Sequence, residues 1–478
     1  MNNNIKLSLS FDDVLLVPKK SSVNSRKQIN TCAQLTKNIR MNIPLVSANM
    51  DSVTESGMAI AMARAGGIGI IHRFLSIEDQ VAEVVKVKRS ESMVVESPYT
   101  IPKNKTVLEA KMFMEEYVVG GLLVVDEKGR LEGILSRKDV VFAENNQKVE
   151  EVMTKNAKMI TINKKVSFDE AKKIMHKHRI EKLPIVDKKG LLQGLITSKD
   201  LQKIKEHPQA LKDEKGRLMV GAAIGVKPGF MDRAEALVKA EVDVLVLDIA
   251  HGHSDLAINV IKKLKQKFKR VDLIAGNVAT KEGTRDLIKA GADAIKVGVG
   301  PGSICITRIV TGAGVPQLSA IIDCSTEAAK NGIPIIADGG VKNSGDLTKA
   351  LAAGASAVMC GNIFAGTEES PGVTILRNGM KYKVSRGMAS FGAAFGRKER
   401  EQESKDMNMD DVVPEGVEAM VPFKGSAKEV INQLIGGLRS GISYCGAKNI
   451  KDLHKNAEFV RITSSGIRES KSHDVQTI

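Results

Sequence analysis

The chain has 478 residues, of which 42% are hydrophobic, and it carries a formal net charge of +15. This length is enough for two to four domains, or for one large barrel with an added module. No apolar stretch approaches the ~18 residues of a membrane span. The lysines are scattered and only 3% of residues are aromatic, which argues against nucleic-acid binding. The positive charge is still compatible with anionic nucleotides as ligands.

Eight short apolar segments rich in β-type residues follow one another along the chain, with helix-like segments between many of them. The predicted strands are Ile43–Met50, Gly67–His72, Arg217–Gly225, Val242–Ala250, Asp272–Val278, Ala294–Gly300, Ile333–Gly340 and Ala357–Gly361. The predicted helices include Glu55–Ala65, Asp232–Ala240, Lys281–Ala290 and Gly345–Ala353. This alternation indicates an α/β fold with a parallel sheet buried on both faces. Eight units predict a (β/α)8 (TIM) barrel, with an open doubly wound sheet as the alternative.

Nearly every predicted strand ends in a cluster of polar residues or glycines. Examples are Ser47–Asp51, Asp248–Ser254, Gly300–Thr307 and Asp338–Gly340. Barrel enzymes keep their chemistry at the carboxyl ends of many strands, whereas an open sheet uses one crevice. The pattern therefore favours the barrel and predicts a site at its mouth.

An insert at 93–207 separates the second predicted strand from the third, so we expect barrel parts at 1–92 and 208–478. The insert contains a repeat, predicted at 93–150 and 151–207, in which Asp126 corresponds to Asp187 and Asp139 to Asp200, a constant offset of 61 residues. Each copy is predicted to be a helix, a strand, a hairpin turn and a second strand. The insert resembles a tandem pair of CBS domains (a Bateman module). That resemblance implies binding of adenine or guanine nucleotides, through Ser136, Asp139, Thr197 and Asp200; the alternative is a purely structural pair.

The five cysteines are scattered, without any Cys-x-x-Cys pair, so we expect neither a disulfide framework nor a structural zinc site. The N-terminus lacks the apolar core of a signal peptide, and we expect a reduced protein in the cytoplasm. Cys305 stands out because it lies in a glycine-rich loop directly after a predicted strand. There a thiol can attack an electrophilic carbon, although a buried cysteine in a tight turn fits the same pattern.

Two further strand ends predict nucleotide contacts. Asp338-Gly339-Gly340 and Gly361-Asn362 follow the seventh and eighth predicted strands, where barrels often bind phosphate through backbone N–H groups. Ser303 can add a hydroxyl. Asp248 is placed to bind a ribose hydroxyl of an oxidant, or else to cap a helix or form an ion pair at the rim. Together these residues predict a nucleoside monophosphate with its base over Cys305.

Motifs along almost the whole chain resemble the IMP dehydrogenase and GMP reductase family. They are Phe11–Leu16, Met50–Glu55, Asp248–Ser254, Gly298–Thr307, Ile336–Gly340, Arg386–Met388, Val413–Gly416, Pro422–Gly425, Ser443–Gly446, Glu469-Ser470 and His473–Val475. The Gly-Ser-Ile-Cys-x-Thr loop is highly specific to this family, and the CBS insert is typical of its dehydrogenases.

The resemblance implies a mechanism and a set of site residues. Cys305 would attack C2 of IMP, hydride would pass to NAD, and a flap at about 390–412 would then help water to hydrolyse the covalent XMP intermediate, with Thr307 and Glu415 relaying a proton. The implied IMP contacts are Met50, Ser303, Asp338, Gly339, Gly340, Gly361, Asn362, Ser385, Gly387, Met388 and Glu415. The implied NAD contacts are Asp248, Asn277, Gly298 and Gly300. Carbonyls of Gly300, Gly302 and Cys305 would bind K⁺ with Glu469, Ser470 and Lys471 of a neighbouring subunit, which implies a homotetramer or octamer.

Some positions depart from the family pattern. The flap lacks the Arg-Tyr pair whose arginine activates water in the dehydrogenases. Arg397 or Arg400 could substitute; the alternative is slower hydrolysis by the Thr307–Glu415 route. Ser385 stands where tyrosine is common, and Asn362 where serine is common. The Ala48–Asp51 segment has a form that GMP reductases share.

Three functions remain in view. The first is IMP dehydrogenase, which the insert, the Val413–Gly416 segment and the tail motif favour. The second is an NADPH-dependent GMP reductase, which the missing Arg-Tyr pair keeps open. The third is a non-catalytic nucleotide sensor, which the intact Cys305, Thr307 and Glu415 oppose.

Overall fold

A computed structural model describes residues 5–91, 94–96, 98–117, 119–163, 166–400 and 413–472. The chain forms two compact units. The first contains Met1–Ser90, Gln209–Asp213 and Leu218–Ile478, and the second contains Glu91–Pro208 and Glu214–Arg217. No described helix combines the length and the apolar content needed to cross a membrane.

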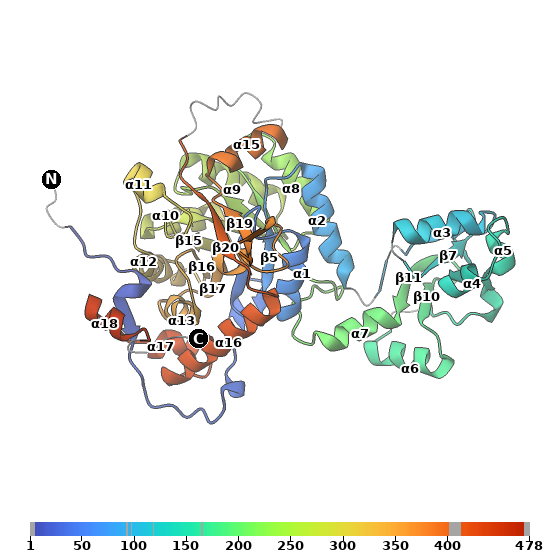
Figure 1. Cartoon of the computed structure of the whole chain (residues 1–478), viewed down its shortest axis with the longest axis horizontal. Helices are drawn as coiled ribbons and strands as arrows, with labels where there is room; N and C mark the ends of the chain where they lie inside the picture. Colours follow the sequence, from blue (N-terminus) through green and yellow to red (C-terminus); the bar gives the residue numbers. More distant parts are fainter. Residues whose placement is uncertain are drawn as a thin grey trace. The chain divides into compact units, whose positions relative to one another are not determined.

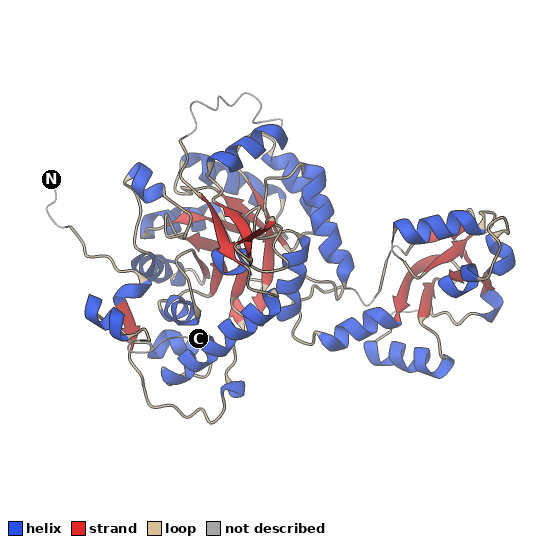
Figure 2. Cartoon of the chain, viewed as in Figure 1, coloured by secondary structure: helices blue, strands red, loops and turns tan. Residues whose placement is uncertain are grey.

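The first unit is built around a closed barrel of eight parallel strands (Figures 1 and 2). Around the barrel the strands are β4 (Leu45–Ser47), β5 (Ile68–Ile71), β12 (Gly221–Ile224), β13 (Val244–Asp248), β14 (Asp272–Val278), β15 (Ala294–Val297), β16 (Ile335–Asp338) and β17 (Ala357–Cys360). Each lies within one of the eight predicted segments. The predicted barrel is confirmed, and the open doubly wound sheet is wrong because β5 pairs with β12 and β4 with β17 to close the ring.

Successive residues of each strand face two different cores, as the two-residue period of a strand requires. In β13, Val244 and Val246 join the core inside the barrel, whereas Leu245 and Leu247 join the core between the strands and the helices. The short strands β2 (Ala33–Gln34) and β3 (Arg40–Met41) contribute to the inner core through Met41 and the adjoining Leu35.

Helices with one apolar face cover the outside of the barrel (Figure 2). They are α1 (Ser56–Ala65), α2 (Ile77–Ser90), α8 (Phe230–Lys239), α9 (Asp255–Lys267), α10 (Lys281–Ala290), α12 (Gln317–Ala329), α13 (Ser344–Ala352) and α16 (Ala427–Tyr444). Helix α10 shows why such segments begin and end where they do. The Thr280 side chain accepts a hydrogen bond from Gly283 N, and Gly291 ends the helix in a left-handed conformation. Short helices α11 (Thr307–Thr311), α14 (Asn362–Ala365), α17 (Ile450–Asn456) and α18 (Ser464–Glu469) follow loops.

An antiparallel sheet of β18 (Thr374–Arg377), β19 (Met380–Arg386) and β20 (Glu418–Pro422) carries the predicted flap. The flap connects β19 to β20, whose ends pair at Arg386 and Glu418. Its first part is the helix α15 (Phe391–Arg400), which the sequence analysis did not predict. Residues 401–412 of the predicted flap lie outside the described residues.

The second unit repeats one structural motif at the offset of 61 residues. Helix α3 (Val107–Glu116) with β7 (Gly121–Val125) and β8 (Leu131–Ser136) corresponds to α6 (Phe168–His178) with β10 (Lys182–Val186) and β11 (Leu192–Thr197). The two hairpin turns bond to each other, with Leu131 N donating to Gly190 O at 3.0 Å and Leu192 N donating to Gly129 O at 3.1 Å. The repeats are therefore related as a pair around these turns.

The predicted insert (93–207) and its predicted copies (93–150 and 151–207) can be compared with the ends of the second unit. The compact unit begins at Glu91 and includes Pro208, while residues 92 and 93 lie outside the described residues. The predicted division at 150/151 falls inside the helix α5 (Val149–Val152). Ser136 and Asp139 hydrogen-bond to each other at the start of α4 (Arg137–Val141), as do Thr197 and Asp200 at the start of α7 (Ser198–Glu206).

Candidate active site

A cavity of about 500 Å³ lies at the carboxyl ends of the barrel strands. Parallel strands bring the residues that follow them to one end of a barrel, so side chains far apart in sequence meet there. Many of the predicted site residues line this cavity: Met50, Asp248, Asn277, Gly298, Gly300, Gly302, Cys305, Thr307, Asp338, Gly339, Gly387, Met388 and Glu415.

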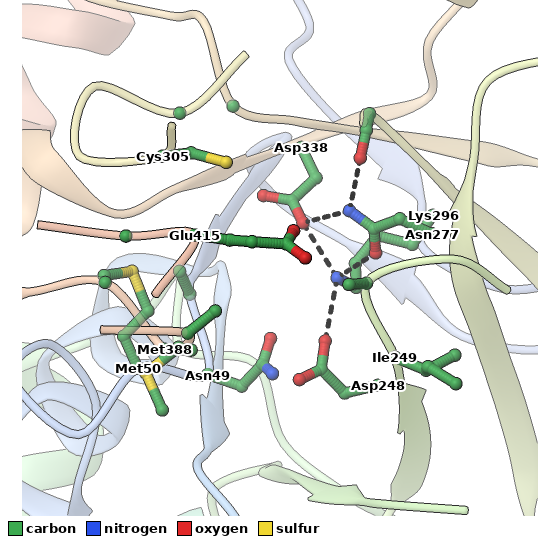
Figure 3. A pocket seen from close by; sticks show the side chains of 18 of the residues that line it. Asn49, Met50, Asp248, Ile249, Asn277, Lys296, Cys305, Asp338, Met388 and Glu415 are labelled. Atoms are coloured by element: carbon green, nitrogen blue, oxygen red, sulfur yellow. Dashed lines mark hydrogen bonds and ion pairs between the residues drawn. The ribbon is translucent and has the colours of Figure 1, made fainter. Parts of the chain in front are cut away.

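The loop between β15 and α11 holds Cys305 at the cavity wall (Figure 3). Its Sγ lies 3.1 Å from Thr307 Oγ1. Arg308 braces the loop, because its Nε donates to Val299 O at 3.1 Å and its NH2 donates to Val315 O at 2.5 Å. Gly300 has a φ of +78°, and a Cβ there would come 2.5 Å from Arg308 Cγ. The loop thus needs glycine at 300 to close around the arginine.

The segment that follows the predicted flap is hydrogen-bonded to the cysteine loop. Ile306 N donates to Glu415 O at 2.8 Å, and Val417 N donates to Ile304 O at 2.9 Å. On the other side, Gly387 N donates to Val417 O at 3.0 Å. These bonds hold the segments that carry Glu415 and Met388, and both residues line the cavity that contains the thiol (Figure 3).

The Asp338 and Asp248 side chains share a cation that the sequence analysis missed. Lys296 is only 2% exposed. Its Nζ donates to Asp338 Oδ2 at 2.8 Å, to Asp248 Oδ1 at 3.2 Å and to Asn277 Oδ1 (Figure 3). Asn277 Nδ2 donates to Asp338 Oδ2 at 2.9 Å. The signal for this residue was available, since a lone lysine inside an apolar strand needs buried partners.

Electrostatics favour the charged forms of Asp248 and Lys296. Burial alone would raise the pKa of Asp248, but the positive charges of Lys296 and Arg73 outweigh it and hold that pKa below its usual range. Burial would likewise lower the pKa of Lys296, but Asp338 and Asp248 hold it above its usual range. The charged forms of Asp248 and Lys296 therefore stabilise each other in the cavity lining.

A second ion pair that sequence reasoning missed joins two of the predicted motifs. Arg386 Nε donates to Asp51 Oδ2 at 2.7 Å, and the arginine makes a further contact with the same oxygen. Asp51 follows Met50, and Arg386 precedes Gly387 and Met388. The pair fixes these two cavity-lining segments relative to each other.

The Gly339-Gly340 turn lies directly against the cysteine loop. Both glycines have φ near +85°, at +89° and +83°, which favours glycine. A Cβ at Gly339 would come 2.9 Å from Pro301 Cγ. This close approach brings the end of β16 to the loop that carries Cys305.

Other predicted site residues do not line the cavity: Ser303, Gly340, Gly361, Asn362, Ser385, Glu469, Ser470 and Lys471. Gly361 still adjoins it, because a Cβ there would lie 2.9 Å from Met50 Sδ. Asn362 is the first residue of α14, and Ser385 is buried on β19. Glu469 ends α18, with Ser470 and Lys471 after it. Arg397 and Arg400 belong to α15, and their side chains lie outside the described part of the chain.

The other four cysteines differ from Cys305 in their surroundings. Cys324 and Cys360 are buried, and burial raises the pKa of each thiol to about 12. Burial also raises the pKa of Cys445, and Cys32 lies partly exposed away from the cavity lining. Of the five cysteines, Cys305 alone lines the cavity, which is inconsistent with a buried cysteine in a plain turn.

The fold and the site together define a (β/α)8-barrel enzyme that presents a thiol, a carboxylate and a glycine turn to a cavity of nucleotide size. The chain belongs to the IMP dehydrogenase/GMP reductase family, since the model described as "IMP dehydrogenase / GMP reductase domain" matches residues 8–473. The family predicted from the motifs is confirmed.

Relatives of both activities match the chain from end to end. It is 56% identical to an inosine-5'-monophosphate dehydrogenase of Nitrosopumilus maritimus, covering 98% of this chain and 99% of that one. It is 50% identical to a GMP reductase of Leishmania donovani, covering 98% and 97%. A cysteine-to-alanine variant of the Trypanosoma brucei GMP reductase, solved with guanosine 5'-monophosphate, superposes with a TM-score of 0.94 at 48% identity over 99% of both chains. Because these GMP reductases align across residues 93–207 as well, the insert does not separate the two activities as we had expected.

Proposed function

We propose that this chain is an NAD-dependent IMP dehydrogenase, which oxidises IMP to XMP in guanine nucleotide biosynthesis. The observation that carries the proposal is the Cys305 thiol at the cavity wall, next to Thr307 and facing the Asp338 carboxylate across the nucleotide-sized space. The dehydrogenase reported above is 56% identical to this chain and the GMP reductase of Leishmania donovani is 50% identical, which supports oxidation over reduction.

In this proposal the cavity residues have separate tasks. Asp338 accepts hydrogen bonds from the IMP ribose, and Met50 and Met388 contact the purine. Backbone N–H groups near Ser303, Gly339, Gly340, Gly361 and Asn362 bind the phosphate, with Ser385 and Gly387 behind it. Cys305 then lies at C2 of the purine, where its sulfur forms a covalent bond.

The second half of the reaction needs a base for water. Thr307 Oγ1 lies at the cysteine sulfur, and Glu415 lines the same cavity, so this pair can accept the proton of a water that attacks the covalent intermediate. Arg397 or Arg400 would bring a further group to this step from the flap.

The cavity residues fit a nicotinamide cofactor. Asp248, Asn277, Gly298 and Gly300 all line the cavity that also contains Cys305 and Asp338. NAD bound there would supply the hydride acceptor, while Asp248 would bind a ribose hydroxyl and the glycines would let the ligand approach the backbone.

The cysteine loop could supply some, but not all, of the ligands that a K⁺ ion needs. Carbonyl oxygens, such as those of Gly300, Gly302 and Cys305, are ligands that hard cations prefer. Three carbonyls from one loop leave a shell of six or more oxygens incomplete. We therefore propose that Glu469, Ser470 and Lys471 of a neighbouring subunit complete the shell, in a homotetramer or octamer. Adenine or guanine nucleotides at the second unit and a cytoplasmic location stay predictions.

GMP reductase is the second candidate, favoured by the absence of the Arg-Tyr pair from residues 390–412. One assay separates the two activities: purified protein receives IMP with NAD, or GMP with NADPH, each with and without K⁺, while absorbance of the reduced nicotinamide is followed. We expect NADH to form with IMP and NAD only. Consumption of NADPH with GMP would refute the proposal, and silence in both arms would favour a nucleotide sensor.

A further inference from the structure

Lys296 occupies a position that its strand neighbours explain. Val246, Ala294 and Ile336 belong to the core inside the barrel. Because every second residue of a strand faces the same side, the residues two positions further on also face the barrel interior. These residues are Asp248, Lys296 and Asp338. In the register of the sheet, Asp248 pairs with Gly276 and Gly276 pairs with Lys296. The lysine therefore stands level with Asp248, two strands away, with a glycine between them.

Gly276 makes the reach of Lys296 possible. A Cβ at Gly276 would lie 2.7 Å from Lys296 Cβ and 2.6 Å from Lys296 O. Without a side chain at 276, the lysine extends across β14 to Asp248 on one side while it contacts Asp338 on the other. The ammonium has three N–H donors, and Asp248, Asn277 and Asp338 take all three.

The two carboxylates belong to different halves of the proposed site. Asp338 is the proposed ribose partner of IMP, and Asp248 is the proposed ribose partner of NAD. The buried ammonium of Lys296 donates hydrogen bonds to both carboxylates. Neither carboxylate can therefore move without changing the hydrogen bonds of the other.

We infer that Lys296 is a positioning residue that couples nucleotide binding at Asp338 to cofactor binding at Asp248. The inference rests on the proposed function for the naming of the two ligands. A ligand that bonds to one carboxylate fixes the ammonium, and the fixed ammonium holds the other carboxylate ready for the second ligand. Such coupling is reciprocal, so it has the same size measured from either ligand.

A control residue of the same kind exists elsewhere in the barrel unit. Lys88 is 4% exposed, and its Nζ donates to Asp213 at 3.0 Å and to Asp243 at 2.6 Å. It is also a buried lysine between two aspartates, but it does not line the cavity. Lys88→Met therefore serves as the control: it shows how the loss of a buried lysine between two aspartates affects the fold when the lysine is not part of the cavity.

The test uses the full chain with Cys305→Ala, so that IMP and NAD bind without reacting. Calorimetry gives the IMP dissociation constant with and without saturating NAD, and the ratio of the two is the coupling factor. We expect a ratio of about five or more in this parent protein. Adding Lys296→Met should weaken IMP binding by tenfold or more and bring the ratio close to one, whereas adding Lys88→Met should change neither.

A second variant keeps the lysine and the shape of the site. Asp248→Asn, which is isosteric, leaves Asp338 as the one carboxylate bonded to Lys296, so Asp338 becomes a weaker acceptor for the ribose. We expect IMP binding without NAD to weaken threefold or more, although Asp248 itself would touch only the cofactor. An unchanged IMP affinity in Asp248→Asn, or equal losses in Lys296→Met and Lys88→Met, would overturn the inference.

The assay of the wild-type chain keeps this inference separate from the proposed function. If that chain turns over GMP with NADPH, the dehydrogenase proposal fails, and the same binding measurements with GMP and NADPH test Lys296. A coupling factor of one in the Cys305→Ala parent would contradict the inference for either ligand pair.

Discussion

Cys305 is the residue on which the proposed chemistry depends. Cys305→Ala removes the sulfur that would bond to the purine but none of the groups proposed to bind the nucleotide. We expect turnover to fall by about a thousandfold or more, while calorimetry still detects IMP binding with little change. Cys32→Ala, at a cysteine outside the cavity lining, should keep full activity. Substantial turnover by Cys305→Ala would show that the reaction needs no covalent step.

The thiols should also differ in their reaction with iodoacetamide, because the thiolate is the reacting form. With pKa values of about 12, Cys324 and Cys360 remain protonated thiols at pH 8. Mass spectrometry of the folded protein treated at pH 8 should find label on Cys305 and none on these two. Bound IMP should protect Cys305 and leave the labelling of Cys32 unchanged. Early labelling of Cys324 or Cys360 in folded protein would contradict the burial described.

At the residue scale, the sequence allowed prediction of side chains that follow a strand but not of those that lie within one. Cys305, Asp248 and Asp338 sit where apolar segments stop, and such positions are visible in a single sequence. Lys296 lies inside an apolar segment, and its partners come from β13, β14 and β16. The Asp51–Arg386 pair spans more than three hundred residues, so no local pattern reveals it.

At the scale of elements, the barrel strands and their helices follow from local patterns, and the flap region does not. The predicted strand Asp272–Val278 agrees with β14, and the predicted helix Lys281–Ala290 agrees with α10. Both are continuous apolar or amphipathic runs with clear ends. The sheet β18–β20 was not predicted, since its strands mix exposed, intermediate and buried residues and are mixed in composition. Helix α15 was missed because Gly392 and Gly396 lower its helix propensity.

Two neighbouring glycines of α16 allow a matched test of helix packing against α13. A Cβ at Gly436 would meet nothing within 4 Å, whereas one at Gly437 would lie 2.1 Å from Ser344 Oγ and 2.4 Å from its Cβ. Alanine is favoured over glycine inside a helix by roughly 0.5–1 kcal/mol. Gly436→Ala should raise the free energy of unfolding by about that amount.

Gly437→Ala gains the same helix propensity but forces α16 away from the first turn of α13. Overpacking of this kind costs about 1–3 kcal/mol, so we expect a net loss of stability. Urea denaturation followed by circular dichroism measures both variants. Equal changes in the two free energies of unfolding would show that the α13–α16 contact adjusts without cost.

At the scale of the whole molecule, the two units divide the work that the proposal assigns to the chain. The cavity lining comes from the first unit alone. The second unit has hydrophobic clusters of its own, around Val107, Leu122 and Val149 in one repeat and Ala171, Leu183 and Ile196 in the other. The repeat pairing through the hairpin turns also lies wholly within that unit. Among the residues that the structure describes, none of the insert belongs to the barrel cores or to the cavity lining.

Replacing residues 92–207 by a short glycine-serine linker should therefore leave catalysis intact. The chain that re-enters the barrel is held there by its own contacts, since Gln209 O accepts from Asn42 Nδ2 at 2.8 Å and Leu211 N donates to Ala63 O at 2.7 Å. We expect the shortened protein to keep kcat and the KM values for IMP and NAD within about threefold, because no residue lining the cavity is removed. Any effect of ATP or GTP on the rate of the full chain should disappear in it. Loss of turnover by a shortened protein that folds and binds IMP would show that the insert supplies part of the catalytic state.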